Sequence, residues 1–124
     1  MELVIAAGAR LGRPFGVAPA LALLLLGQAA ACSSAGEGSE ARDLVAAGAL
    51  LLDVRTTQEF ARGHLPGAVN IPVSQLAKRV SELGDRQRAV VVYCQRGTRS
   101  RMASEVLRRA GFSAVHDLGA MGRW

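Results

Sequence analysis

The residues Ala89-Val90-Val91-Val92-Tyr93-Cys94-Gln95-Arg96-Gly97-Thr98-Arg99-Ser100 contain the transition on which the fold depends. The first five form an uninterrupted apolar run, which is typical of a strand buried on both faces of a sheet. From Ser100 to Ala110, apolar side chains recur at the spacing of one helix face. The pattern therefore predicts a strand over 89–93, a loop over 94–99 and a helix over 100–110.

Strand and helix patterns alternate through the rest of the chain from residue 41 onward. Further strands are predicted over 49–54, 68–71 and 114–116, and further helices over 41–47, 57–62 and 74–83. Ser39 and Ser74 are the expected N-caps of the first and last of these helices, and Thr56 with Glu59 has capping-box spacing. Because strands that alternate with helices form parallel sheets, we predict an α/β fold: a small parallel sheet with helices on both faces.

Composition limits the chain to one domain and excludes several classes of protein. Of the 124 residues, half are hydrophobic, which excludes wholesale disorder. Two cysteines are too few for a disulfide scaffold or a zinc finger, and five aromatic residues provide no stacking platform for nucleic acid. The formal net charge is +5, so an anionic substrate remains open while nucleic acid is not expected as a partner.

The first 31 residues have the pattern of a signal peptide. Arg10 and Arg13 precede an apolar run over 17–26, and three alanines follow over 29–31. The run is too short to cross a bilayer, which takes about 20 apolar residues. A buried core helix is the alternative, but no polar residue alternates with the leucines to form a second face. We therefore expect export to the periplasm or the cell envelope.

Cys32 directly follows this small-residue region, and the arrangement resembles the lipobox of bacterial lipoproteins. The resemblance implies a lipidated Cys32 as the first mature residue, so that the protein meets the membrane only through this anchor. Soluble export after cleavage near Ala31 is the alternative. In either case residues 32–40, rich in Ser, Gly and Glu, are expected to be a flexible linker before a domain over 41–124.

Cys94 is the candidate functional residue of the predicted loop. It follows a buried strand at its carboxyl end, where α/β sheets bind ligands. The helix N-terminus, the charges of Arg96 and Arg99 and the loop N–H groups all favour a thiolate, lowering its pKa by roughly one to several units from about 8.5. Gly97 permits the positive φ that an anion-binding loop needs. The alternative is that Cys94 is a small apolar residue at a strand end.

Four ordered motifs resemble the rhodanese homology domain. They are Leu51–Arg55 with Glu59-Phe60, Gly63–Pro72, Val91–Ser100, and Gly111-Phe112 with Leu118–Trp124. One departure is Gly119-Ala120, where family members usually have two glycines. The resemblance runs from about residue 40 to Trp124.

The resemblance implies sulfur transfer through a persulfide on Cys94, with no metal and no organic cofactor. Its donor is a small anion such as thiosulfate, and its acceptor is cyanide, a thiol or a redox protein. The N–H groups of the anion loop over 95–99 would stabilise the sulfur. Arg96 and Arg99 are the candidates for steering the donor, with bracing of the loop as the alternative for Arg99. The substrate-binding and anion-loop residues are Gln95, Arg96, Gly97, Thr98 and Arg99.

Three further residues are expected to support this loop. Asp53 and Arg55, after the strand over 49–54, are interpreted as a polar brace beneath it. His64 matches the family's usual histidine and is interpreted as a hydrogen-bonded turn residue, because a thiolate stabilised by its loop needs no general base. Glu59 is explained by the capping box.

Two other functions are alternatives to the transferase. Cysteine phosphatases of related fold separate Cys and Arg by five residues, whereas four separate Cys94 from Arg99 here. This tighter ring suits a single sulfur atom better than a phosphate. The second alternative is a non-catalytic rhodanese-like module that carries sulfur or binds a protein.

Overall fold

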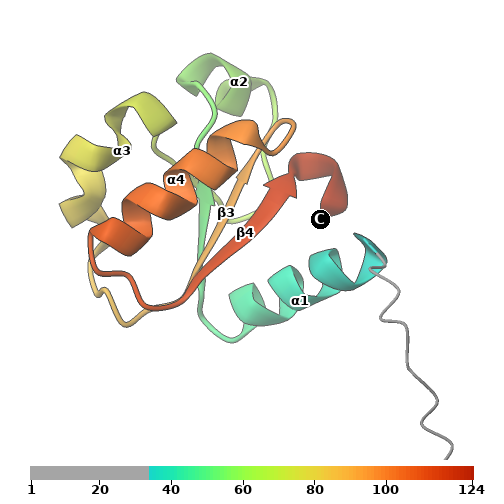
Figure 1. Ribbon diagram of the computed structural model, residues 1–124. Coiled ribbons are helices and arrows are strands. Elements are labelled where there is room, and N and C mark those ends of the chain that lie inside the picture. Colours follow the sequence, from blue (N-terminus) through green and yellow to red (C-terminus); the bar gives the residue numbers. More distant parts are fainter. Residues whose placement is uncertain (1–33) are drawn as a thin grey trace, which may run out of the picture. The chain divides into compact units, whose positions relative to one another are not determined.

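The computed structural model describes residues 34–124, which form a parallel sheet covered by helices (Figure 1). The predicted signal peptide and Cys32 lie outside the described residues. The strands are β1 (Leu50–Asp53), β2 (Val69–Asn70), β3 (Val90–Cys94) and β4 (Val115–Ala120). The helices are α1 (Ser34–Ala46), α2 (Thr57–Arg62), α3 (Val73–Arg79) and α4 (Thr98–Arg109), with 3-10 turns η1 (Val80–Leu83) and η2 (Met121–Arg123).

The sheet has the order β2-β1-β3-β4, and all its pairs are parallel. At the centre of the sheet, Leu50 of β1 pairs with Val90 of β3, and Asp53 pairs with Tyr93. The two strands therefore end at the same edge of the sheet. The register of β3 and β4 shifts between Val92 and Tyr93. The predicted α/β fold is confirmed, and β3 extends one residue further than predicted, to Cys94 itself.

Alternate residues of the central strands face two separate apolar layers. Leu52, Val90 and Val92 pack with α3, η1 and α4, whereas Leu51 and Val91 pack against α1 on the other face. This two-sided burial explains why β1 and β3 are uninterrupted apolar runs in the sequence. Helices cover both faces of the sheet, as predicted (Figure 1). Helix α2 follows β1 in the chain, after the carboxyl end of that strand.

The expected linker over 32–40 is wrong from residue 34 onward, because α1 begins at Ser34 instead of at Ala41. Ser39 is not its N-cap, since its hydroxyl donates to the carbonyl of Gly36 inside the helix. The helix extends because it packs against the C-terminal turn η2. Arg123 pairs with Glu37 at 3.0 Å, and a Cβ on Gly38 would overlap the carbonyl oxygen of Arg123. These long-range contacts stabilise a Gly- and Ser-rich segment that has low helix propensity.

The other helix boundaries confirm one predicted cap and correct two helix starts. Thr56 and Glu59 form the predicted capping box, and α2 has the predicted bounds. Ser74 is not a cap, since α3 begins at Val73 after Pro72 and has no side-chain cap. Helix α4 begins two residues before Ser100, because the peptide N–H of Arg101 already donates to the carbonyl of Gly97. Between residues 34 and 124, no helix combines the length and the apolar character needed to span a membrane.

Candidate active site

The loop between β3 and α4 closes around the sulfur of Cys94. Cys94 is the last residue of β3, Gln95 and Arg96 follow it, and Gly97 is the N-cap of α4. Gly97 has φ 104°, in the left-handed region that side-chain-bearing residues rarely adopt. This turn of the backbone directs the Gly97 N–H at the Cys94 Sγ, with 2.9 Å between nitrogen and sulfur. The sulfur is therefore held by the loop that follows it.

Ser100 is a residue of this site that the sequence reasoning missed. It is fully buried in the first turn of α4, and its hydroxyl lies 2.9 Å from the Gly97 carbonyl oxygen. Its peptide N–H and its hydroxyl also contribute to lowering the pKa of the Cys94 thiol. The sequence signal for this role is a serine in the first turn of the helix after the loop. The hydroxyl of such a residue can form a hydrogen bond with a backbone group at the start of the helix.

The balance of burial and hydrogen bonding lowers the pKa of Cys94. Burial of the sulfur disfavours the thiolate and by itself raises the pKa. The N–H groups of Ser100, Gly97 and Arg96, together with the Ser100 hydroxyl, favour the thiolate and outweigh burial. The pKa of Cys94 therefore lies below its usual value, chiefly through short-range hydrogen bonds from the loop. Cys94 is only 1% exposed, so its sulfur is screened from bulk water.

Asp53 and Arg55 form a buried ion pair beside the loop. The Arg55 Nε and Nη2 donate to the Asp53 carboxylate at 2.7–3.1 Å, and the pKa of Arg55 is raised chiefly by this contact. Arg55 also donates to Gln95 Oε1 at 3.3 Å and to the carbonyl of Gly63 at 2.7 Å. One guanidinium therefore connects the end of β1 with the active loop and with the turn after α2.

Arg99 is tied to Glu59 by two hydrogen bonds of 2.7 and 3.0 Å. Glu59 is also the capping-box residue of α2, so this pair joins the start of α4 to the start of α2. The hydrogen bonds from Arg99, followed by that from the Thr56 N–H, lower the pKa of Glu59 to about 2. Of the two roles considered for Arg99, this geometry matches bracing. Arg96 has no ion pair within residues 34–124, and its cation remains available.

His64 lies in the turn after α2, where its Nδ1 is 3.0 Å from the Phe60 carbonyl oxygen. Its ring stacks on that of Phe60 with 3.7 Å between centroids. His64, Arg55, Gln95 and Met121 line an open cavity of about 450 Å³ beside the loop. This cavity borders the active loop at Gln95.

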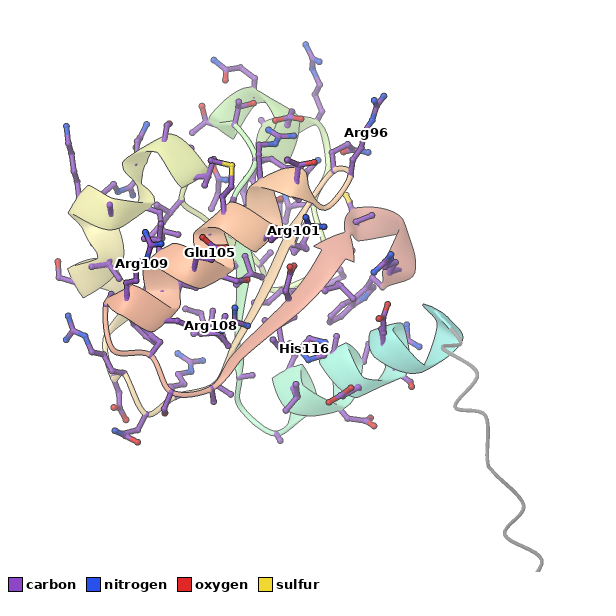
Figure 2. The ribbon with its side chains drawn as sticks, in the orientation of Figure 1. Arg96, Arg101, Glu105, Arg108, Arg109 and His116 are labelled. Atoms are coloured by element: carbon purple, nitrogen blue, oxygen red, sulfur yellow. The ribbon has the colours of Figure 1, made fainter. Side chains whose placement is uncertain are left out.

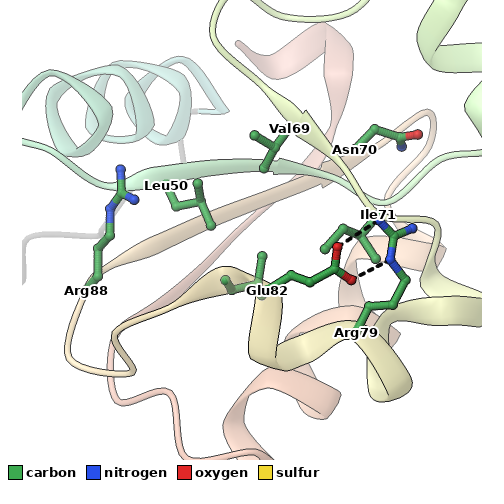
Figure 3. A pocket seen from close by; sticks show the side chains of 8 residues that line it. Leu50, Val69, Asn70, Ile71, Arg79, Glu82 and Arg88 are labelled. Atoms are coloured by element: carbon green, nitrogen blue, oxygen red, sulfur yellow. Dashed lines mark hydrogen bonds and ion pairs between the residues drawn. The ribbon is translucent and has the colours of Figure 1, made fainter.

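A separate cavity of about 270 Å³ lies beside the edge strand β2 (Figure 3). Its walls include Leu50, Val69 and Ile71, and Arg79 pairs with Glu82 at its rim. None of the residues that line it belongs to the active loop. Within the part of the chain that the structure describes, no three His, Cys, Asp or Glu side chains come together to ligate a metal.

Comparison with known proteins identifies similar sequences and folds. The family model described as "Rhodanese-like domain" matches residues 37–124. The chain is 38% identical to "Thiosulfate sulfurtransferase 16, chloroplastic" of Arabidopsis thaliana, over 68% of this chain and 80% of that protein. It is 37% identical to "Putative sulfur carrier protein YrkF" of Bacillus subtilis, over 52% of this chain and 35% of that protein.

A solved structure supports the same likeness. The "Human Single Domain Sulfurtranferase TSTD1" has a TM-score of 0.62 and 33% identity, covering 69% of this chain and 89% of that one. For three of the curated relatives that the chain matches, the matched part is only 26–60% of their own length. The likeness therefore describes one domain, and the activity of those longer proteins does not transfer as a whole.

Removal of the Ser100 hydroxyl should raise the pKa of Cys94. In Ser100→Ala we expect the pKa to rise but to stay below that of a buried thiol without donors, because one favourable hydrogen bond is lost and the peptide N–H groups remain. The measurement is a titration of thiolate ultraviolet absorbance, taken as the difference from Cys94→Ser so that Cys32 cancels. Ser104→Ala, which removes a buried hydroxyl one turn further along α4, is the control. Equal shifts in both variants would contradict this role for Ser100.

The ion pair between Glu59 and Arg99 should make stability depend on pH. The folded pKa of Glu59 is about 2, below its unfolded value of about 4.3, so the stabilisation is complete above the unfolded value and is lost as pH falls toward 2. Glu59→Gln keeps a capping-box residue and removes the charge. Because the pair is partly exposed, we expect it to lose about 1 kcal/mol of unfolding free energy at pH 7.

Urea unfolding at pH 7 and at pH 3 measures this difference. The gap between wild type and Glu59→Gln should shrink at pH 3. Glu105→Gln is the control, since Glu105 is exposed and lies 3.9 Å from Arg109. A gap that is independent of pH, or that matches the control, would count against the ion pair.

Proposed function

Because the chain belongs to the family of rhodanese-like domains, we propose that it is a sulfurtransferase that moves a sulfane sulfur from thiosulfate or a similar anion through a persulfide on Cys94. Sulfurtransferases are among its relatives and structural neighbours, which supports a transferase in general. The observation that carries the specific proposal is the loop hydrogen bonding that lowers the pKa of the Cys94 thiol. The thiolate is the nucleophilic form of cysteine.

In the first half-reaction the Cys94 thiolate attacks the outer sulfur of thiosulfate. A bond forms between the two sulfurs, the sulfur–sulfur bond of the donor breaks, and sulfite leaves with that bond's electron pair. Cys94 becomes a persulfide that retains one negative charge. The N–H groups that face the thiolate are placed to stabilise this anion as well, and Arg96 supplies the unpaired charge that attracts the donor.

In the second half-reaction an acceptor attacks the terminal sulfur of the persulfide. The bond to the Cys94 sulfur breaks, and its electron pair restores the thiolate. Cyanide would yield thiocyanate, whereas a thiolate of a small molecule or of a redox protein would yield a new persulfide. Splitting the transfer into two displacements is covalent catalysis, and it requires no metal or organic cofactor.

A sulfur carrier or binding module is the second candidate function. It is favoured by the 1% exposure of Cys94 and by the similarity to a putative sulfur carrier. Such a protein would accept one sulfur and hold it until a specific partner removed it. The two functions therefore differ in turnover with a small acceptor and not in persulfide formation.

Thiosulfate should add one sulfur atom to Cys94, and cyanide should remove it repeatedly. Intact-mass analysis of the full chain after incubation with thiosulfate measures the first step, and thiocyanate production measures turnover. Cys94→Ser should lose both, while Ser104→Ala serves as a folded control that should keep both. A persulfide without turnover would replace the enzyme with the carrier. No added sulfur with several sulfane donors would overturn both the enzyme and the carrier, and would leave the binding module.

We extend the proposal to the location of the protein: it is exported and held at the cell envelope by a lipid on Cys32. The basic, apolar and small-residue order of residues 1–31 supports export, and the position of Cys32 supports lipidation. Mass spectrometry of the mature N-terminus should find a lipidated Cys32. An unmodified Cys32 on the exported protein would indicate soluble export instead, and a retained Met1 in the mature protein would overturn export itself.

A further inference from the structure

A small basic pocket lies between the N-terminal half of α4 and the end of β4, next to the active loop. Its volume is about 170 Å³, below the roughly 300–1,000 Å³ of pockets that hold drug-sized ligands. Three arginines line it: Arg96 from the loop, Arg101 from α4 and Arg123 from η2. Figure 2 shows Arg101 on the side of α4 that faces β4, and Arg96 extending from the loop ahead of that helix. Its size suits a compact ion.

The charges around the pocket leave an excess of cations. Among residues 34–124, the one carboxylate that lines the pocket is that of Asp117, whose Oδ1 accepts the Gly119 N–H at 2.9 Å. Neither Arg96 nor Arg101 forms an ion pair with any residue of the described part of the chain. Arg123 pairs with Glu37 at 3.0 Å, but both side chains are about half exposed, so water weakens this pair. An incoming anion can therefore compete for Arg123.

The backbone gives the pocket a floor that lacks side chains. Gly97 and Gly119 both have positive φ, and each lies within van der Waals distance of where the other's Cβ would stand. A Cβ on Gly119 would stand 3.4 Å from Arg123 Nη1, so a side chain there would occupy the space in front of this guanidinium. The two glycines thus keep open part of the space that the three arginines line.

From this arrangement we infer that the pocket is an oxyanion-binding site, distinct from the loop around the Cys94 sulfur and selective for compact divalent oxyanions such as sulfate or sulfite. Arginine guanidinium groups recognise oxyanions through paired N–H donors. The Gly97 N–H points to the sulfur, whereas its Cα borders the pocket, so the two sites share one backbone segment from opposite sides. The site does not depend on the proposed transfer reaction, because none of its arginines needs a persulfide to bind an anion.

Isothermal titration of the full chain with sulfate tests this site, with ionic strength held constant by sodium chloride. We expect saturable binding of one sulfate per chain. Arg101→Gln should weaken it about tenfold, through loss of a charge-assisted contact. Arg109→Gln, which removes an equal charge from an exposed position of the same helix, should leave the affinity unchanged. Glu37→Gln should strengthen binding, because it releases Arg123 from its competing carboxylate.

Cys94→Ser separates this site from the reaction site. It should abolish sulfur transfer and leave sulfate binding at least as tight, so a failed transferase assay would not affect this inference. Loss of sulfate binding in Cys94→Ser but not in Arg101→Gln would overturn it, by placing the anion at the sulfur loop. If Arg101→Gln and Arg109→Gln weakened sulfate binding equally, the inference would also be overturned, because the affinity would then depend only on the net charge of the protein. A parallel titration with sulfite compares the reaction product with an ambient oxyanion, and saturable binding of either supports the site.

Discussion

The hydrogen bonds that converge on the Cys94 sulfur are the constraint on which the rest of the site depends. Burial of the Cys94 thiol, which is 1% exposed, raises its pKa because burial penalises the charged form. Three peptide N–H groups and the Ser100 hydroxyl act in the opposite direction, and together they lower this pKa below its usual value. They do so only if the chain turns back immediately after β3, which requires the left-handed backbone of Gly97. The chemistry therefore depends on the shape of a very short loop.

Two ion pairs hold that loop from different directions. Asp53 with Arg55 anchors it to β1, and Glu59 with Arg99 anchors the start of α4 to α2. A buried pair such as the first repays its desolvation only when its remaining donors are also satisfied. Arg55 meets this condition through Gln95 and Gly63. The two ion pairs therefore also position residues that line the cavity beside the active loop.

The arginines near the loop divide into two groups with different physical roles. Arg55 and Arg99 are engaged by carboxylates and act as structural connections. Arg96 and Arg101 have no carboxylate partner among residues 34–124, so their charge acts outward, on ions in solution. Positive charge that is concentrated in this way favours the binding of small anions on both sides of the active loop.

The sequence alone determined the features that depend on neighbouring residues. Apolar runs predicted β1 and β3, the spacing of Thr56 and Glu59 predicted a cap, and the position of Cys94 after a buried strand predicted the loop. Only the tertiary structure decided the features that join distant segments: the extension of α1 against η2, the partner of Arg99, and the pocket of Arg101 and Arg123. The reason is physical: hydrophobic period and capping act over a few residues, whereas a guanidinium's partner is set by whichever segments the fold brings together.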